Sequence, residues 1–359
     1  MQPVANRPKI EMGGPMRYLH KLLIVSTCCA VVTLALVSES TSFASVKARS
    51  TMKGLTLAFV ERASNNPVFA AMAGGSKIAA TQLGGKLITE GPTAPTPTSQ
   101  IPFIQTLTLK HVAGIFISSN DMSANDTALK AAARAGTTVV TMDSDTDASA
   151  RRVFVSDGTT QAIGIVSLKM LCSELPKCSG QVAIISGAAN SPNQNAWVAV
   201  MVNAIKHDPQ YRGIKLVKIA YGNDVPQTAT TVAEGVLQQF PHLAGLMMPS
   251  SVAMVAVAQV LEQTHKAGKI MMTGLALPSQ MIHYIQDKTV KQFSIWNMSN
   301  LGYLAYWVTY ELHVGKLTGA VGESFVAGTL GRRVIGPGGV ISVGNPAIIS
   351  AANISHFHF

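Results

Sequence analysis

The sequence is poor in charge, in cysteine and in long apolar stretches. Of its 359 residues only 13% are charged and 47% are hydrophobic, a balance that excludes an intrinsically disordered chain. Four cysteines are too few for a disulfide scaffold of this length. Repeated apolar spans of about 20 residues, which a polytopic membrane protein requires, are missing. A large globular protein remains, and its length corresponds to about two domains.

Motifs for nucleotide binding and for covalent chemistry are also missing. No GxGxxG follows the first predicted strand, and GxxxxGK[ST] does not occur. Neither HExxH nor GxSxG is present. The nine histidines do not cluster at metal-ligand spacing, except His356 and His358, which we interpret as a frayed tail. The sequence therefore predicts a protein that is not an enzyme and has no metal and no cofactor.

The N-terminal residues 1–44 have the three parts of an export signal peptide. Residues 16–21 are basic, residues 22–37 are apolar and uncharged, and Ala44 is a small residue suited to the cleavage site. We expect cleavage after Ala44 and a periplasmic location. Because the apolar part is slightly long, an uncleaved membrane anchor is the alternative. Translation starts at either Met1 or Met16.

Basic residues exceed acidic ones, but they are dispersed. Cleavage of the signal would lower the formal net charge from +10 to +8, since it removes four basic and two acidic residues. No run of Lys and Arg is longer than two and no aromatic residues are interleaved with them, so no nucleic-acid partner is expected.

Two cysteines remain after cleavage, Cys172 and Cys178. An oxidising compartment and a spacing of six residues permit a disulfide between them. Two buried free thiols are the alternative.

From residue 55 onward, short apolar runs alternate regularly with longer amphipathic stretches. The runs predict strands over Leu55–Glu61, Lys86–Glu90, Val112–Ile117, Thr137–Met142, Arg152–Val155, Gln181–Ser186, Ile214–Ala220, Leu243–Met248, Lys269–Gly274 and Lys291–Trp296. The stretches predict helices over Val68–Leu83, Asp126–Ala135, Thr160–Cys172, Ala196–His207, Thr228–Gln239, Val252–Lys266 and Leu301–Val314. Apolar strands separated by single helices indicate an α/β protein with parallel sheets covered on both faces. Ten strands exceed one sheet of this size, so we expect two α/β domains.

Polar and aromatic residues gather where the predicted strands end, in segments 61–69, 141–147, 191–197, 248–251, 274–277 and 294–297. In open α/β sheets, ligands bind at the carboxyl ends of the strands. Carboxylates and amides bond to hydroxyl groups, and aromatic rings cover the C–H faces of a sugar. A sugar-binding site is therefore predicted. Taken singly, each Asp or Asn has helix capping as its alternative role.

Six segments of the chain resemble the type I periplasmic solute-binding proteins of ABC importers, most closely the branch that binds rhamnose and autoinducer-2. They are ASNNPVFAAMAGGSKIAATQLGGKLITEGPT, VAGIFISSNDMSA, GTTVVTMDSDTDASARRVFV, NQNAWV, TVAEGVLQQFPHLAGLMMPSS and VKQFSIWN. The resemblance extends from residue 55 to residue 353.

This resemblance implies two Rossmann-like lobes joined by three hinge crossings, with the ligand in the interlobe cleft. Lobe one would comprise residues 50–155 plus 298–325, and lobe two residues 156–297 plus 326–359. The protein would capture a small neutral sugar or an autoinducer-2-like ligand and deliver it to an ABC transporter membrane permease, as a monomer.

The resemblance also places the site residues. Lobe one would contribute Arg62, Phe69, Asp143 and Asp145, lobe two Asn193, Gln194, Pro249 and Ser251, and a crossing Trp296 and Asn297. Three positions depart from the autoinducer-2 pattern, because Arg62 replaces a lysine, Asn193 replaces an aspartate and Ser251 adds a hydroxyl. Val68 stands where ribose-type binders have a stacking phenylalanine, which leaves Phe69.

Other functions fit the same pattern less well. A LacI-type regulator shares this core, but it requires a helix-turn-helix where residues 22–37 are apolar. A ligand-binding partner of a chemoreceptor would also have this fold. An exported enzyme would need Asp143 and Asp145 as an acid/base pair, yet residues two apart on an extended segment do not flank one bond.

Overall fold

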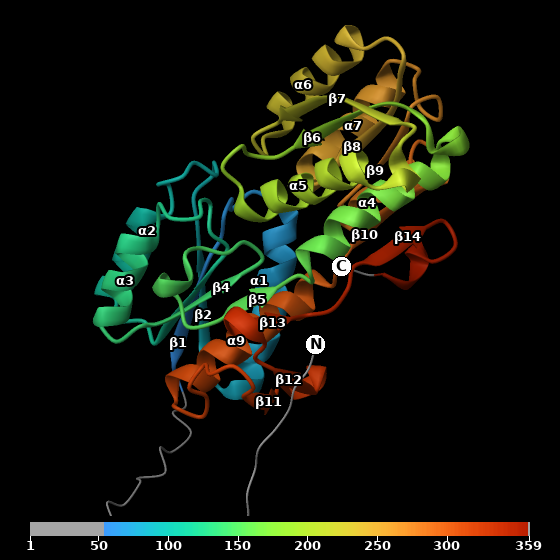
Figure 1. The fold of residues 1–359 in the computed structure, drawn as a ribbon. Coiled ribbons are helices and arrows are strands. Elements are labelled where there is room, and N and C mark those ends of the chain that lie inside the picture. The colour runs from blue at the N-terminus through green and yellow to red at the C-terminus, as the bar shows by residue number, and fades with distance from the viewer. Residues whose placement is uncertain (1–53, 358–359) are drawn as a thin grey trace, which may run out of the picture. The chain divides into compact units, whose positions relative to one another are not determined.

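The computed structural model describes residues 54–357, shown in Figure 1. The predicted export signal lies outside this range. Within it, no helix combines the length and the apolar character needed to cross a membrane.

The first lobe is built on a six-stranded parallel sheet. In spatial order its strands are β13 (Val340–Ser342), β5 (Phe154–Ser156), β4 (Thr138–Met142), β3 (Gly114–Ile117), β1 (Thr56–Val60) and β2 (Lys86–Glu90). Because all six run in parallel, their carboxyl ends lie along one edge.

The second lobe is built on a four-stranded parallel sheet. Its spatial order is β7 (Ile214–Tyr221), β6 (Gly180–Ser186), β8 (Leu243–Met248) and β9 (Met271–Gly274). β10 (Gln292–Ile295) continues it through a bridge between Leu275 and Ser294. β10 also pairs antiparallel with β14 (Ala347–Ser350). All ten predicted strands are thus present, nine of them in the two large sheets and β10 in a two-stranded sheet with β14.

Four short strands near the C-terminus were not predicted. β11 (Ser324–Val326) and β12 (Arg332–Val334) form an antiparallel hairpin. β13 pairs with β5 in the first sheet, so the predicted boundary, which gave residues 326–359 to lobe two, is wrong for β13. Strands of three or four residues are too short for an apolar pattern to stand out. The chain passes between the lobes at 157–159, 296–297 and 343–346.

Helices cover both faces of each sheet (Figure 1). In the first lobe, α1 (Pro67–Leu83) and α9 (Met298–His313) lie on one face, and α2 (Ile101–Leu109) and α3 (Asp126–Arg134) on the other. In the second lobe, α4 (Thr160–Glu174) and α5 (Pro192–His207) lie opposite α6 (Pro226–Gln239) and α7 (Ser251–Gln263), with α8 (Pro278–Gln286) beside α7. The 3₁₀-helices are η1 (Ala148–Ala150), η2 (Pro176–Cys178), η3 (Pro209–Tyr211), η4 (Gly328–Leu330), η5 (Pro337–Gly339) and η6 (Ile354–His356).

Successive side chains along a strand point to opposite faces of the sheet, so each sheet has a hydrophobic core on both faces. In β1, Leu57 and Phe59 join the core beneath α1 and α9, whereas Ala58 and Val60 join the core beneath α2 and α3. All four are fully buried. Burial on both faces is why these strands appear in the sequence as continuous apolar runs.

α1 and α9 approach each other closely through two glycines. A Cβ atom added at Gly75 would lie 1.8 Å from the Ser299 carbonyl oxygen, and one at Gly302 would lie 1.9 Å from the Met72 carbonyl oxygen. No side chain larger than hydrogen fits at either position. Since α9 follows the second lobe in the chain, this contact joins segments far apart in sequence.

A disulfide links the end of α4 to η2. It joins Cys172 to Cys178, whose Cα atoms are 4.5 Å apart, within the range that disulfides span. The loop that it closes is short.

Replacing both cysteines by serine should lower the free energy of unfolding by about 2 kcal/mol, because the bridge restricts the unfolded chain. Urea denaturation of the double variant and the wild type measures this difference. In the wild type, both thiols should resist alkylation after denaturation until a reductant is added. Labelling without reductant would show that the bridge does not form.

Candidate ligand-binding site

The carboxyl ends of the two sheets face one cavity, here called the central cavity. Eight of the predicted residues line it: Arg62, Phe69, Asp143, Asn193, Gln194, Pro249, Ser251 and Trp296. The other lining residues are Asn66, Val68, Trp197, Asp224, Leu275, Ile295 and Met298. Both lobes therefore contribute polar and apolar groups to the same space.

Arg62 follows β1 and reaches across to the second lobe. Its guanidinium donates hydrogen bonds to Ser191 Oγ (2.6 Å) and Asn193 Oδ1 (3.2 Å), and it pairs with Asp224 Oδ2 at 3.4 Å. Its Cζ atom lies 5.7 Å from the ring centroid of Phe69, a cation–π distance. The planar guanidinium makes several directed contacts that a lysine ammonium would not reproduce.

Asp143 follows β4 in the left-handed region, with a φ of 61°. Its carboxylate accepts hydrogen bonds from Ser118 Oγ (2.5 Å) and, across the lobes, from Asn193 Nδ2 (3.0 Å). Burial raises the pKa of Asp143, while the positive charge of Arg62 opposes that rise. Burial, together with the neighbouring Asp143, raises the pKa of Asp157 well above its usual range. Two buried carboxyl groups with raised pKa values therefore lie side by side at this end of the first sheet.

Asp224 belongs to the central cavity, although it was not among the predicted residues. It follows β7, and both Asn223 and Asp224 are left-handed, with φ of 55° and 52°. Asp224 Oδ1 accepts a hydrogen bond from Ser250 Oγ at 2.6 Å. A Cβ atom at Gly187 would lie 2.2 Å from Asp224 Oδ1, so a glycine is needed there. The sequence carried the signal, because Asp224 also stands at the carboxyl end of a predicted strand.

Aromatic side chains form much of the apolar wall. The rings of Trp197 and Trp296 meet edge to face, with centroids 5.6 Å apart. The indole Nε1 of Trp296 is buried and donates no hydrogen bond to any residue in the range 54–357. A ligand acceptor would satisfy this donor, while the rings provide surface for C–H groups.

Two predicted residues, Asp145 and Asn297, do not line the central cavity. Asp145 forms a two-pronged ion pair with Arg151, at 2.7 and 2.8 Å, which occupies its carboxylate. Asn297 caps α9 by accepting a hydrogen bond from the Asn300 backbone N–H at 2.9 Å. Capping was the alternative role for such residues, and for Asn297 the structure favours it.

Direct hydrogen bonds hold the lobes together around the central cavity, whose volume is about 30 Å³. Besides the contacts of Arg62 and the bond between Asn193 and Asp143, Asn190 Nδ2 donates to the Asn120 carbonyl oxygen at 2.7 Å. A volume of about 30 Å³ corresponds to roughly one water molecule. A sugar must therefore replace some of these bonds, and the lobes must separate to admit it.

Glu61, beside Arg62, is 6% exposed, and burial raises its pKa from 4.5 to about 7. The folded protein thus binds a proton more tightly than the unfolded chain does. Its stability should fall as the pH rises from about 4.5 to 7. Burial also raises the pKa of Glu174 to about 7, so this residue contributes a slope of the same sign. Glu61→Gln should therefore reduce the slope and raise the free energy of unfolding at pH 8 by up to about 3 kcal/mol. Denaturation at pH 4 and pH 8 measures it.

The control is Glu234→Gln, at an exposed position on α6, which should leave the pH slope unchanged. A Glu61→Gln protein that keeps the wild-type slope would show that another group causes it.

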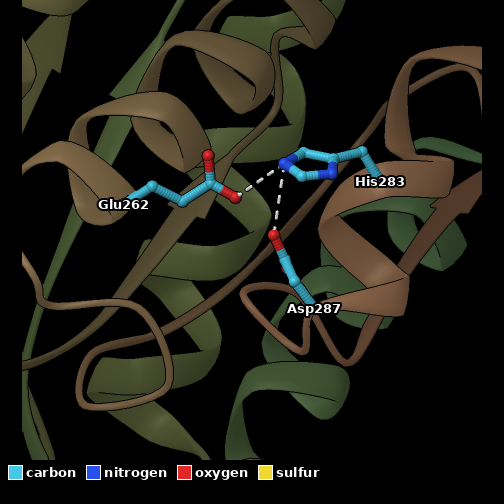
Figure 2. A group of neighbouring side chains, drawn as sticks. All are labelled: Glu262, His283 and Asp287. Atoms are coloured by element: carbon cyan, nitrogen blue, oxygen red, sulfur yellow. Dashed lines mark ion pairs between the residues drawn. The ribbon is translucent and has the colours of Figure 1, made fainter.

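Within residues 54–357, the side chains that together offer metal-ligating atoms are Glu262, His283 and Asp287 (Figure 2). His283 Nε2 lies 3.2 Å from Glu262 Oε1 and 3.3 Å from Asp287 Oδ2. The histidine is 71% exposed, and none of the three lines the central cavity. When protonated, His283 bridges the two carboxylates and thereby links α7 to α8. The absence of a metal and of a cofactor stays a prediction.

Comparison with known proteins gives one consistent result. Residues 57–317 match the family described as the periplasmic binding protein domain. A sugar ABC transporter structure from Actinomyces odontolyticus is 36% identical, with 85% of this chain and 98% of that chain covered and a TM-score of 0.69. A solute-binding protein from Clostridium phytofermentas with bound L-rhamnose is 29% identical, with 85% and 98% covered and a TM-score of 0.80. LsrB from Clostridium saccharobutylicum in complex with AI-2 is 24% identical, with 85% and 100% covered, and its TM-score of 0.81 indicates the same fold.

Proposed function

Because this chain belongs to the periplasmic binding protein domain family, we propose that it captures a small neutral sugar between its lobes and delivers it to an ABC transporter permease. We further propose that residues 1–44 are an export signal, that the mature protein works as a monomer in the periplasm, and that it performs no covalent chemistry.

The composition of the central cavity carries this proposal. Arg62 and Asp143 from the first lobe face Gln194 and Asp224 from the second, and three aromatic rings complete the wall. Groups of this kind bind the hydroxyls and the C–H faces of a sugar. The family resemblance and the site composition support the same ligand class.

The charges support a ligand without net charge. Arg62 is already paired with Asp224, and Asp143 is a second buried carboxyl group beside it. A ligand carboxylate would meet two or more carboxyl groups around a single guanidinium, which is unfavourable in a buried site. Hydroxyl groups can donate to the carboxylates and accept from Arg62 at no such cost.

Rhamnose or an autoinducer-2-like molecule is our proposed ligand, since relatives with this fold are described with bound L-rhamnose or AI-2. Binding would couple to transport through lobe closure. A ligand that contacts both lobes binds the closed state more tightly than the open one and shifts the equilibrium toward it.

Thermal denaturation with a panel of sugars, including L-rhamnose, D-arabinose and D-tagatose, and with AI-2 tests the proposal. The true ligand at 100 times its dissociation constant should stabilise the protein by about 2.7 kcal/mol, and calorimetric titration should give one site per chain. If no neutral sugar and no AI-2 raises the melting temperature or releases heat, the proposed function is wrong.

A further inference from the structure

A second cavity, here called the side cavity, adjoins the central cavity. Its volume is about 280 Å³, which is roughly nine times the volume of one water in the liquid. Asp143, Asn193 and Trp197 border both cavities. A group attached to a ligand in the central cavity can therefore extend past these three residues into the side cavity.

One carboxyl oxygen of Asp157 is a buried polar atom of the side cavity without a partner among the described residues. Asp157 follows β5, is only 2% exposed and lines the side cavity. Its Oδ1 atom accepts no hydrogen bond within the described residues. Buried carboxyl oxygens are nearly always hydrogen-bonded, so a donor from outside the chain would complete this one.

Much of the remaining wall is apolar. Phe154 on β5, Ile163 on α4 and Val340 on β13 contribute side chains to it. An occupant should thus be largely apolar, with a hydroxyl directed at Asp157. A water cluster would leave the apolar side chains in contact with water, which is unfavourable. An alkyl, aryl or second sugar group would cover them.

We propose that the side cavity binds the substituent of an O-linked sugar, so that the natural ligand is a glycoside or disaccharide rather than a free monosaccharide. This inference rests on the proposed sugar-binding function. The sugar ring occupies the central cavity, and the glycosidic bond passes beside Asp143 and Trp197.

Calorimetric titration with paired probes tests this inference. L-rhamnose and each other free sugar of the panel are compared with their methyl and phenyl glycosides. The wild type should bind the phenyl glycoside of its sugar at least tenfold more tightly than the free sugar. Ala196→Phe, on α5 at the side cavity, should lose this preference and keep its affinity for the free sugar within about twofold.

Ala199→Phe is the matched control, because it adds the same ring at an exposed position on the same helix, and it should bind both probes like the wild type. Thr160→Phe is a second variant, at an exposed position that also lines the side cavity, in case Ala196→Phe does not fold.

Three results would overturn the inference. If the wild type binds a free sugar and rejects its glycosides, or binds both equally, the inference is wrong and the proposed function stands. If a folded side-cavity variant loses the free sugar as well, the side cavity is not a separate subsite. If the wild type binds neither the free sugars nor their glycosides, the proposed function itself fails and the inference fails with it.

Discussion

Replacing Arg62 by methionine should lower the free energy of unfolding by about 3–5 kcal/mol, since it removes one partner of a buried ion pair. The Asp224 carboxylate would keep its bond from Ser250 but would lose its positive partner. Ser191 and Asn193 would also lose a donor that reaches them from the other lobe. Sugar affinity should fall by about 10- to 150-fold as well, because a charged donor is lost from the central cavity.

Urea denaturation and calorimetric titration measure the two effects. Lys110→Met is the control, since Lys110 pairs with Glu90 but its side chain is 50% exposed, and an exposed pair contributes at most about 1 kcal/mol. Arg62→Lys should lie between the wild type and Arg62→Met, because it keeps the charge and loses the planar contacts. Equal stability of Arg62→Met and Lys110→Met would show that Arg62 is not held as the structure describes.

Asp143→Ala should weaken sugar binding by about 10- to 150-fold, because a buried ligand hydroxyl would lose a charge-assisted acceptor. The matched control is Asp147→Ala. Asp147 is exposed and caps η1 by accepting a hydrogen bond from the Ser149 backbone N–H, so its loss should barely change affinity. Titration of both variants with the sugar that stabilises the wild type measures the difference.

A purely structural role for Asp143 makes a different prediction. Asp143 also accepts hydrogen bonds from Ser118 and Asn193, so its removal would then lower the melting temperature of the free protein and leave the affinity unchanged. If Asp143→Ala binds sugar like the wild type, the assignment of the first-lobe side of the site is wrong.

The sequence predicted the central strands well because parallel strands buried on both faces are continuous apolar runs. β1, with Leu57 to Val60 fully buried, is such a run. β13 pairs over three residues only, and a run that short resembles many loop segments. Its place in the first sheet depends on tertiary contacts that no local pattern encodes.

The site was predictable to the extent that it follows from topology. Carboxyl ends of parallel strands meet along one edge, so residues such as Arg62 and Asp143 converge although 80 positions separate them. Asp224 obeys the same rule, since it follows β7, but it was not among the predicted residues. Asp145 pairs with Arg151 and borders the side cavity instead of the central one, and the sequence could show neither contact.

The order in which the chain is synthesised has a consequence for the first lobe. Its core requires α9, which meets α1 at Gly75 and Gly302, and its sheet is completed by β13. Both segments leave the ribosome after the whole four-stranded sheet of the second lobe. The second lobe should therefore fold first, and the first lobe should wait for contacts between segments that lie on either side of the second-lobe sheet in the sequence. Until β13 has been synthesised, the first lobe therefore lacks the edge strand of its sheet.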